Sequence, residues 1–167
     1  RIILKKLPKF RNLLASKLFR KLKYGLIKRN FSYITSPIRM SPDFLIIGAV
    51  RCGTTSLYYD ICEHSCVLPA SYDEIGFFDS NYELGLNWYK SMFPTKFQRK
   101  KIESKTNICI TGEDTPFYFW SKKAAERIKK DFPKIKLIIL LRNPIDRAYS
   151  NYHLGVRLGS ESLSFED

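Results

Sequence analysis

The stretch that decides the fold is Phe44-Leu45-Ile46-Ile47-Gly48-Ala49-Val50-Arg51-Cys52-Gly53-Thr54-Thr55. Its first four residues are a short, continuous apolar run, which is typical of a strand covered on both faces of a parallel sheet. The next residues carry a glycine at each end and predict a loop. Thr54 to about Glu63 then predicts a helix, because apolar residues recur there at i,i+4 spacing. The stretch therefore predicts a strand–loop–helix unit.

We call residues 48–56 the cradle, because backbone N–H groups of such a loop and of the following helix start can surround an anion. Glycine permits positive φ and a close approach of the backbone. The spacing Gly-x-x-x-x-Gly is that of a nucleotide P-loop, but Thr54 stands where a P-loop has lysine. The positive charge comes from Arg51 inside the loop instead. A P-loop kinase or NTPase remains an alternative, weakened by the missing lysine.

Further strand and helix patterns follow along the chain. Residues 108–111 predict a second, weaker strand, and residues 137–141 form the clearest buried strand. Ser121 predicts the cap of a helix over 122–132, and Asn143-Pro144 predicts the start of another. Alternating strands and helices predict an α/β fold, a three-layer α/β/α arrangement with a parallel sheet.

Charge is distributed unevenly over the 167 residues, whose formal net charge is +13. Residues 1–40 carry twelve basic side chains and no acid, which leaves 17 bases against 16 acids in residues 41–167. We therefore predict a basic N-terminal arm (1–40) and a nearly neutral domain (41–167). The body has no charge excess, so we expect no specific nucleic-acid binding.

The arm itself has two open interpretations. Leu7, Leu14 and Leu18 share one helical face, which fits a basic amphipathic helix on an anionic membrane surface or another polyanion. The same pattern fits a solvated helix that packs on another part of the protein.

The termini and the four cysteines bear on size and location. The chain starts at Arg1 and stops at Asp167 without a closing element, so we expect a piece of a longer protein. No apolar run is long enough for a transmembrane helix, and four cysteines do not make a disulfide scaffold. The compartment stays open: cytoplasmic or membrane-associated for a microbial protein, and the Golgi lumen for a truncated eukaryotic one.

Four segments in order resemble the PAPS-dependent sulfotransferases, closest to the heparan sulfate and carbohydrate group. The cradle resembles the family's 5′-phosphosulfate loop. The other three are Asp73-Glu74-Ile75-Gly76-Phe77-Phe78-Asp79 with Gly85-Leu86-Asn87-Trp88-Tyr89 behind it, Glu113-Asp114-Thr115-Pro116-Phe117-Tyr118-Phe119, and Leu140-Leu141-Arg142-Asn143-Pro144-Ile145-Asp146-Arg147-Ala148-Tyr149-Ser150. The resemblance covers about residues 43–167.

The resemblance implies transfer of a sulfuryl group from PAPS to a hydroxyl or amine, with PAP as product and no metal. It implies that Glu74 is the general base and that Arg51 stabilises the leaving phosphate, where the family commonly has lysine. The implied cofactor-binding residues are Arg51, Cys52, Gly53, Thr54, Thr55 and Ser56 around the 5′-phosphosulfate, and Arg142 and Ser150 around the 3′-phosphate. The implied acceptor is a glycan or another hydroxyl or amine compound.

One departure keeps another function class open. Asp114 stands where the heparan sulfate group often has lysine, which changes the charge near the acceptor. Together with Arg51 in place of lysine, this keeps a non-catalytic module that binds PAP or a polyanion as an alternative. Asp73 is a second candidate for the base.

Overall fold

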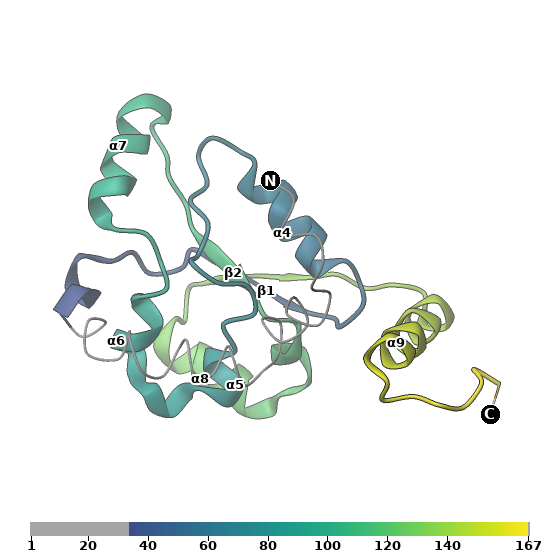
Figure 1. The fold of residues 1–167 in the computed structure, drawn as a ribbon. Coiled ribbons are helices and arrows are strands. Elements are labelled where there is room, and N and C mark those ends of the chain that lie inside the picture. The colour runs from purple at the N-terminus through teal and green to yellow at the C-terminus, as the bar shows by residue number, and fades with distance from the viewer. Residues whose placement is uncertain (1–33, 167) are drawn as a thin grey trace, which may run out of the picture.

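The computed structural model describes residues 34–166. A three-stranded parallel sheet lies at its centre, with strand order β2-β1-β3 (Figure 1). Its strands are β1 (Phe44–Gly48), β2 (Gly112–Asp114) and β3 (Lys136–Ile139). The sheet is therefore built from segments nearly a hundred residues apart, and β1 is the strand to which both others are hydrogen-bonded.

Helices and short 3₁₀ turns connect and cover these strands. The helices are α4 (Thr54–Cys62), α5 (Phe77–Ser80), α6 (Gly85–Lys90), α7 (Lys96–Thr106), α8 (Lys122–Asp131) and α9 (Pro144–Leu158). The 3₁₀ turns are η2 (Ser36–Ile38), η3 (Tyr82–Leu84) and η4 (Pro116–Trp120). Figure 1 shows α4 on one side of the sheet, α5 and α8 on the other, and α9 projecting beyond the end of the strands.

The two faces of β1 explain the layers. Leu45 belongs to an aromatic core that includes buried residues of α5, α6 and α8. Phe44 and Ile46 point to the other face, where they pack with Tyr58 of α4. Because successive strand residues face opposite sides, one apolar run supplies both cores. The predicted α/β fold with a parallel sheet between two helical layers is confirmed.

Local signals in the sequence set several boundaries. The predicted strand before the cradle and the helix after it are confirmed as β1 and α4. The side chain of Ser121 accepts a hydrogen bond from the N–H of Ala124 at the start of α8. Asn143 accepts one from the N–H of Ile145, and Pro144 occupies the first turn of α9. These caps satisfy N–H groups that a helix leaves without intrahelical partners.

Two strand predictions need correction. Residues 108–111 hold only a single bridge, Val67 to Ile110, and the strand itself begins at Gly112. A Cβ at Gly112 would lie 2.6 Å from the ring of Phe44, so this pairing with β1 requires a glycine. The segment 137–141 is not fully buried, since Leu137 is 49% and Leu141 76% exposed. In the described sheet β3 is an edge strand, with a neighbour on one side only.

The predicted amphipathic face of the arm lies outside the described residues. The last residues of the arm are described, and they pack on the domain: Met40 is 2% exposed, and its N–H donates to the carbonyl of Pro94 at 2.9 Å. Within residues 34–166, no helix combines the length and the apolarity that crossing a membrane requires.

Candidate functional site

The cradle begins where β1 ends against η4. A Cβ on Gly48 would lie 2.5 Å from Cβ of Phe119, so only glycine allows this approach. The N–H of Cys52 donates to the carbonyl of Ala49 at 3.1 Å and closes the loop. Gly53 then takes a left-handed conformation (φ 88°) as the N-cap of α4, and nothing lies within 4 Å of where its Cβ would be.

The start of α4 presents donors to the space above the loop. The N–H groups of Thr54, Thr55 and Ser56 belong to the first turn, which has no intrahelical acceptor. Thr55 and Ser56 are exposed, whereas Thr54 is 4% exposed. Gly53 caps the helix without a side chain, so no side chain of the cap occupies these donors. An anion at this place would meet aligned N–H groups and the positive end of the helix dipole.

Arg51 joins the cradle to α9. Its Nε and Nη2 both donate to Oγ of Ser150, at 3.1 and 3.0 Å. Arg51 adopts a positive φ of 67°, which is uncommon for a residue with a side chain. Nη1 of Arg142, which follows β3, lies 3.5 Å from the carbonyl oxygen of Arg51. The structure thus gathers three of the predicted phosphate ligands, two of them guanidinium groups.

Glu74 lies on a loop that is attached to β2. Its N–H donates to the carbonyl of Asp114 at 3.1 Å, and the N–H of Gly76 donates to Oγ1 of Thr115 at 3.1 Å. The neighbouring Asp73 accepts a hydrogen bond of 2.7 Å from the hydroxyl of Tyr59 on α4. These contacts hold the acidic loop between β2 and the helix that begins in the cradle.

Asp114 is the carboxylate at the centre of this arrangement. It is fully buried, and within the described residues neither carboxylate oxygen has a hydrogen bond of ordinary geometry. Burial raises the pKa of Asp114 to about 6, and the charges of Asp73 and Glu74 act in the same direction, while the Thr55 hydroxyl opposes them. Asp114 therefore links the cradle to the acidic loop electrostatically.

The predicted site residues thus form two groups. Arg51, Arg142 and Ser150 stand at one end of the cradle, and Glu74 stands beside β2. No hydrogen bond within residues 34–166 joins Glu74 to Arg51. The Cys52 thiol turns back to the carbonyl of Val50 at 3.7 Å.

Sequence reasoning did not identify Glu113 as a separate group. It is fully buried on β2 and accepts hydrogen bonds from the hydroxyls of Tyr89 (2.8 Å), Tyr118 (3.0 Å) and Thr115 (2.7 Å). Burial raises the pKa of Glu113 to about 7, although the three hydroxyl donors oppose the shift. The one available signal was the aromatic run Phe117-Tyr118-Phe119 that begins four residues later. Glu113 anchors β2 in the aromatic core, on the side away from the cradle helix.

The first strand of this parallel sheet leads through a glycine-bounded loop into a helix, and Arg142 lies beyond the neighbouring strand β3. This arrangement is typical of α/β domains that bind phosphate-type anions. The family model described as "Sulfotransferase domain" matches residues 41–165. The chain belongs to the sulfotransferase family.

Individual relatives agree with this assignment. The chain is 35% identical over 116 residues to the "Membrane-associated sulfotransferase kil1" of Dictyostelium discoideum, covering 70% of this chain and 23% of that protein. It is 36% identical over 117 residues to the "Bifunctional heparan sulfate N-deacetylase/N-sulfotransferase 3" of Homo sapiens, covering 66% of this chain and 13% of that protein. The chain therefore spans less than a quarter of the length of these two relatives.

A solved structure supports the same fold. A sulfotransferase from Alicyclobacillus acidocaldarius superimposes with a TM-score of 0.57 and 29% sequence identity. The match covers 76% of this chain and 55% of the other.

Proposed function

We propose that this chain carries the donor-binding part of a sulfotransferase that uses PAPS and acts on a hydroxyl or amine of a carbohydrate. The single observation that carries the proposal is the contact of Arg51 with Ser150, next to Arg142. It places two permanent positive charges and a hydroxyl beside the N-terminus of α4. This is a donor set suited to a ligand with two separate phosphate-type groups.

The donor-binding residues fit PAPS by their chemistry. The N–H groups of Thr54, Thr55 and Ser56 would bind the 5′-phosphosulfate, and Arg142 with Ser150 would bind the 3′-phosphate. PAPS supplies a sulfuryl group whose transfer breaks the bond to the 5′-phosphate and releases PAP. Arg51 would stabilise the negative charge that develops on that phosphate. A guanidinium stays charged at neutral pH, so its role is electrostatic and not that of a proton donor.

Glu74 would remove the proton from the acceptor hydroxyl or amine. Its loop is fixed to β2 by two hydrogen bonds, from the N–H groups of Glu74 and Gly76, which hold the backbone that carries the carboxylate. A positioned carboxylate is a standard general base. The names of relatives that act on heparan sulfate support a carbohydrate acceptor. The division into a basic arm (1–40) and a catalytic domain, and contact of the arm with an anionic membrane, stay proposals.

Calorimetric titration of the full chain with PAP, 5′-AMP and ATP plus Mg²⁺ tests the donor assignment. We expect PAP to bind about tenfold tighter than 5′-AMP, because a guanidinium–phosphate contact is worth roughly a factor of ten or more. Arg142→Ala and Ser150→Ala should lose this preference. Arg157→Ala, an exposed change two turns further along α9, should keep it.

Two outcomes would overturn the proposal. Binding of ATP with Mg²⁺ as tight as that of PAP would favour the P-loop NTPase. Equal binding of PAP and 5′-AMP would remove the 3′-phosphate site.

Transfer of ³⁵S from labelled PAPS to a panel of glycans then tests the base. Glu74→Gln should abolish the transfer and leave PAP binding intact, and retained transfer would contradict the role of Glu74. PAP binding without transfer to any acceptor by the unmodified chain would favour a non-catalytic module.

A further inference from the structure

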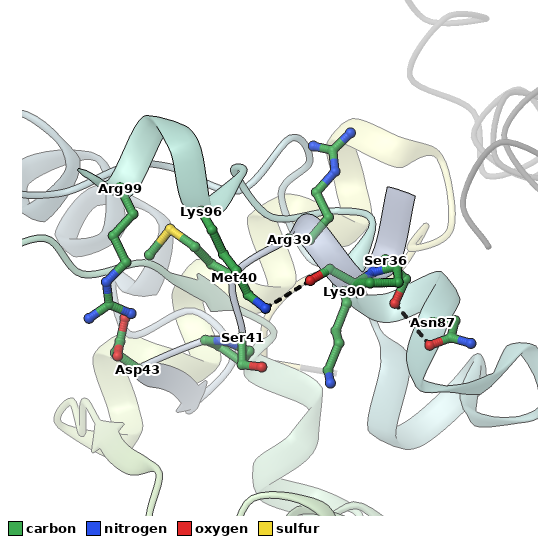
Figure 2. Close-up of a pocket in the computed structure, with 11 residues that line it drawn as sticks. Ser36, Arg39, Met40, Ser41, Asp43, Asn87, Lys90, Lys96 and Arg99 are labelled. Atoms are coloured by element: carbon green, nitrogen blue, oxygen red, sulfur yellow. Dashed lines mark hydrogen bonds between the residues drawn. The ribbon is translucent and has the colours of Figure 1, made fainter. Parts of the chain in front are cut away.

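A second cationic site lies at the opposite end of β1 from the cradle. A cavity of about 430 Å³ is bordered by the segment before β1, by the end of α6 and by the start of α7 (Figure 2). Four of its lining residues are basic, and we call them the basic pocket: Arg39, Lys90, Lys96 and Arg99. The volume is within the range of small-molecule sites, about 300–1,000 Å³.

The walls of the basic pocket are fixed by contacts between distant segments. Lys96 Nζ donates to the carbonyl of Pro37 at 2.8 Å, and Oγ of Ser36 donates to Oδ1 of Asn87 at 2.9 Å (Figure 2). Arg39 Nη1 donates to the carbonyl of Phe93 at 2.9 Å. These hydrogen bonds tie the segment before β1 to the two helices that border the cavity and to the residues between them.

The positive charges of the pocket are only partly balanced. Its one acidic lining residue is Asp43, whose Oδ2 already accepts the N–H of Thr111 at 3.0 Å. Arg99 points toward Asp43 (Figure 2). Its Nε also pairs with Oε1 of Glu103 at 2.7 Å. Arg39 and Lys90 have no carboxylate partner within the described residues.

Some hydrogen-bond donors of these basic side chains have no acceptor among the described residues. Nε of Arg39 is buried and has no hydrogen-bond partner among the described residues. A lysine ammonium has three donors, and Lys96 uses one of them on the Pro37 carbonyl. An anion in the cavity would accept hydrogen bonds from Lys90 and Lys96 and offset their positive charge, whereas the Arg39 guanidinium is directed away from both (Figure 2).

The distance from the cradle sets the length of a ligand that would reach both sites. Asp43 precedes β1 and Gly48 ends it, so the two sites are separated by a five-residue strand, about 16 Å at 3.3 Å per residue. An acceptor that reaches both the cradle and this cavity must therefore be several sugars long. Lys96, Arg99 and Lys100 also recur at i,i+3,i+4 spacing along α7, which extends a basic surface outward from the cavity.

We propose that the basic pocket binds the sulfate or carboxylate groups of an acidic glycan chain, at a site separate from the cradle. The proposal rests on the proposed function for the nature of the polymer, a carbohydrate acceptor. It adds that the acceptor is an anionic oligosaccharide several sugars long, held at a distance from the atom that receives the sulfuryl group.

Titration of the full chain with a sulfated heparin octasaccharide tests this site. Lys90→Gln/Lys96→Gln should weaken binding about tenfold or more, since the change removes two charge-assisted contacts. The control Lys129→Gln/Lys130→Gln removes the same charge from an exposed part of α8. It should change the affinity less than twofold. PAP titration of both variants should match the unmodified chain, which separates failure of this site from failure of the proposed function.

Lys90→Gln alone protects the test against a folding defect, because no described hydrogen bond is lost with that side chain. It should weaken octasaccharide binding severalfold at an unchanged thermal midpoint. Equal losses in the pocket variant and the control would show non-specific attraction and overturn the proposal. A pocket variant that loses binding to vesicles of phosphatidylserine, but not to the octasaccharide, would assign the site to lipid headgroups and would also overturn it.

Discussion

Replacement of Glu113 should change how stability depends on pH. Its pKa is raised from 4.5 to about 7, chiefly by burial. A carboxyl with a raised pKa in the folded state stabilises the fold fully below pH 4.5, and this contribution is lost as the pH rises through 7. A shift of this size corresponds to about 3 kcal/mol of free energy of unfolding, at about 1.4 kcal/mol for each pKa unit.

Glu113→Gln keeps the shape of the side chain and removes the titration. Urea unfolding of the unmodified chain at pH 5 and pH 8 should show a larger loss of unfolding free energy than the same pair of measurements on Glu113→Gln, by about 2–3 kcal/mol. Other groups that titrate in this window, such as Asp114, are common to both proteins and cancel in the comparison. An identical pH dependence in the two proteins would refute the reasoning.

Glu113→Ala provides the second part of this test. It leaves the hydroxyls of Tyr89, Tyr118 and Thr115 without their shared acceptor in the core. At pH 8 the cost of Glu113→Ala should be about 2–3 kcal/mol smaller than at pH 5, because the unmodified chain is itself destabilised there. At about 1–3 kcal/mol for each of the three buried unpaired hydroxyls, the cost at pH 5 is about 3–9 kcal/mol. A cost below about 1 kcal/mol at pH 5 would mean that the three hydroxyls find other partners, which contradicts a carboxylate anchor for β2.

Three further predictions concern the site. Asp114→Asn should raise the free energy of unfolding at pH 8 by about 1–3 kcal/mol and leave it nearly unchanged at pH 4. The reason is that the pKa of Asp114 is raised to about 6 and its charge is unpaired. Urea unfolding that shows no gain in stability at pH 8 would contradict this. Gly48→Ala should lower the free energy of unfolding by about 3 kcal/mol in the same assay, and Gly53→Ala by about 1 kcal/mol. The Phe119 side chain blocks a Cβ at position 48, whereas open space surrounds a Cβ at position 53. Arg51→Lys should weaken PAP binding about tenfold in calorimetry, and Arg51→Ala about a hundredfold. Lysine keeps the positive charge but not the forked contact with Ser150. Equal losses of PAP affinity in the two variants would contradict a role for that geometry.

The parts of the fold that the sequence predicts correctly are those with local causes. The apolar run of β1, the glycine-bounded cradle and the Asn143-Pro144 helix start each act within a few residues. Side-chain caps and glycine conformations operate at that range, so their signals survive in any context.

The incorrect predictions have causes in the tertiary structure. Gly112-Glu113-Asp114 contains a glycine and two acids, which disfavour a strand. These residues nevertheless pair with β1, because the Phe44 ring covers the glycine and three hydroxyls donate hydrogen bonds to the buried Glu113 carboxylate. The apolar run at 137–141 predicts burial, but burial depends on which elements flank a strand. That information is not present in the run itself.

The site residues also divide into those that local sequence signals identify and those that only the tertiary structure brings together. The contact of Arg51 with Ser150 joins residues 99 positions apart, and sequence reasoning identified both only through family motifs. The basic pocket was not predicted at all. Its cations are spread from residue 39 to residue 99 and become neighbours only when the segment before β1 packs on α6 and α7.

The link between Arg51 and Ser150 also has a consequence for the order of folding. The cradle and α4 are local and can form early, whereas α9 must be synthesised and positioned behind β3 before Ser150 can receive the guanidinium. Contacts between distant residues carry a larger entropic cost of closure and tend to form late. A nascent chain that ends before residue 150 therefore has the loop without the contact that orients its arginine. Affinity for a doubly phosphorylated nucleotide should appear only in the last step of assembly.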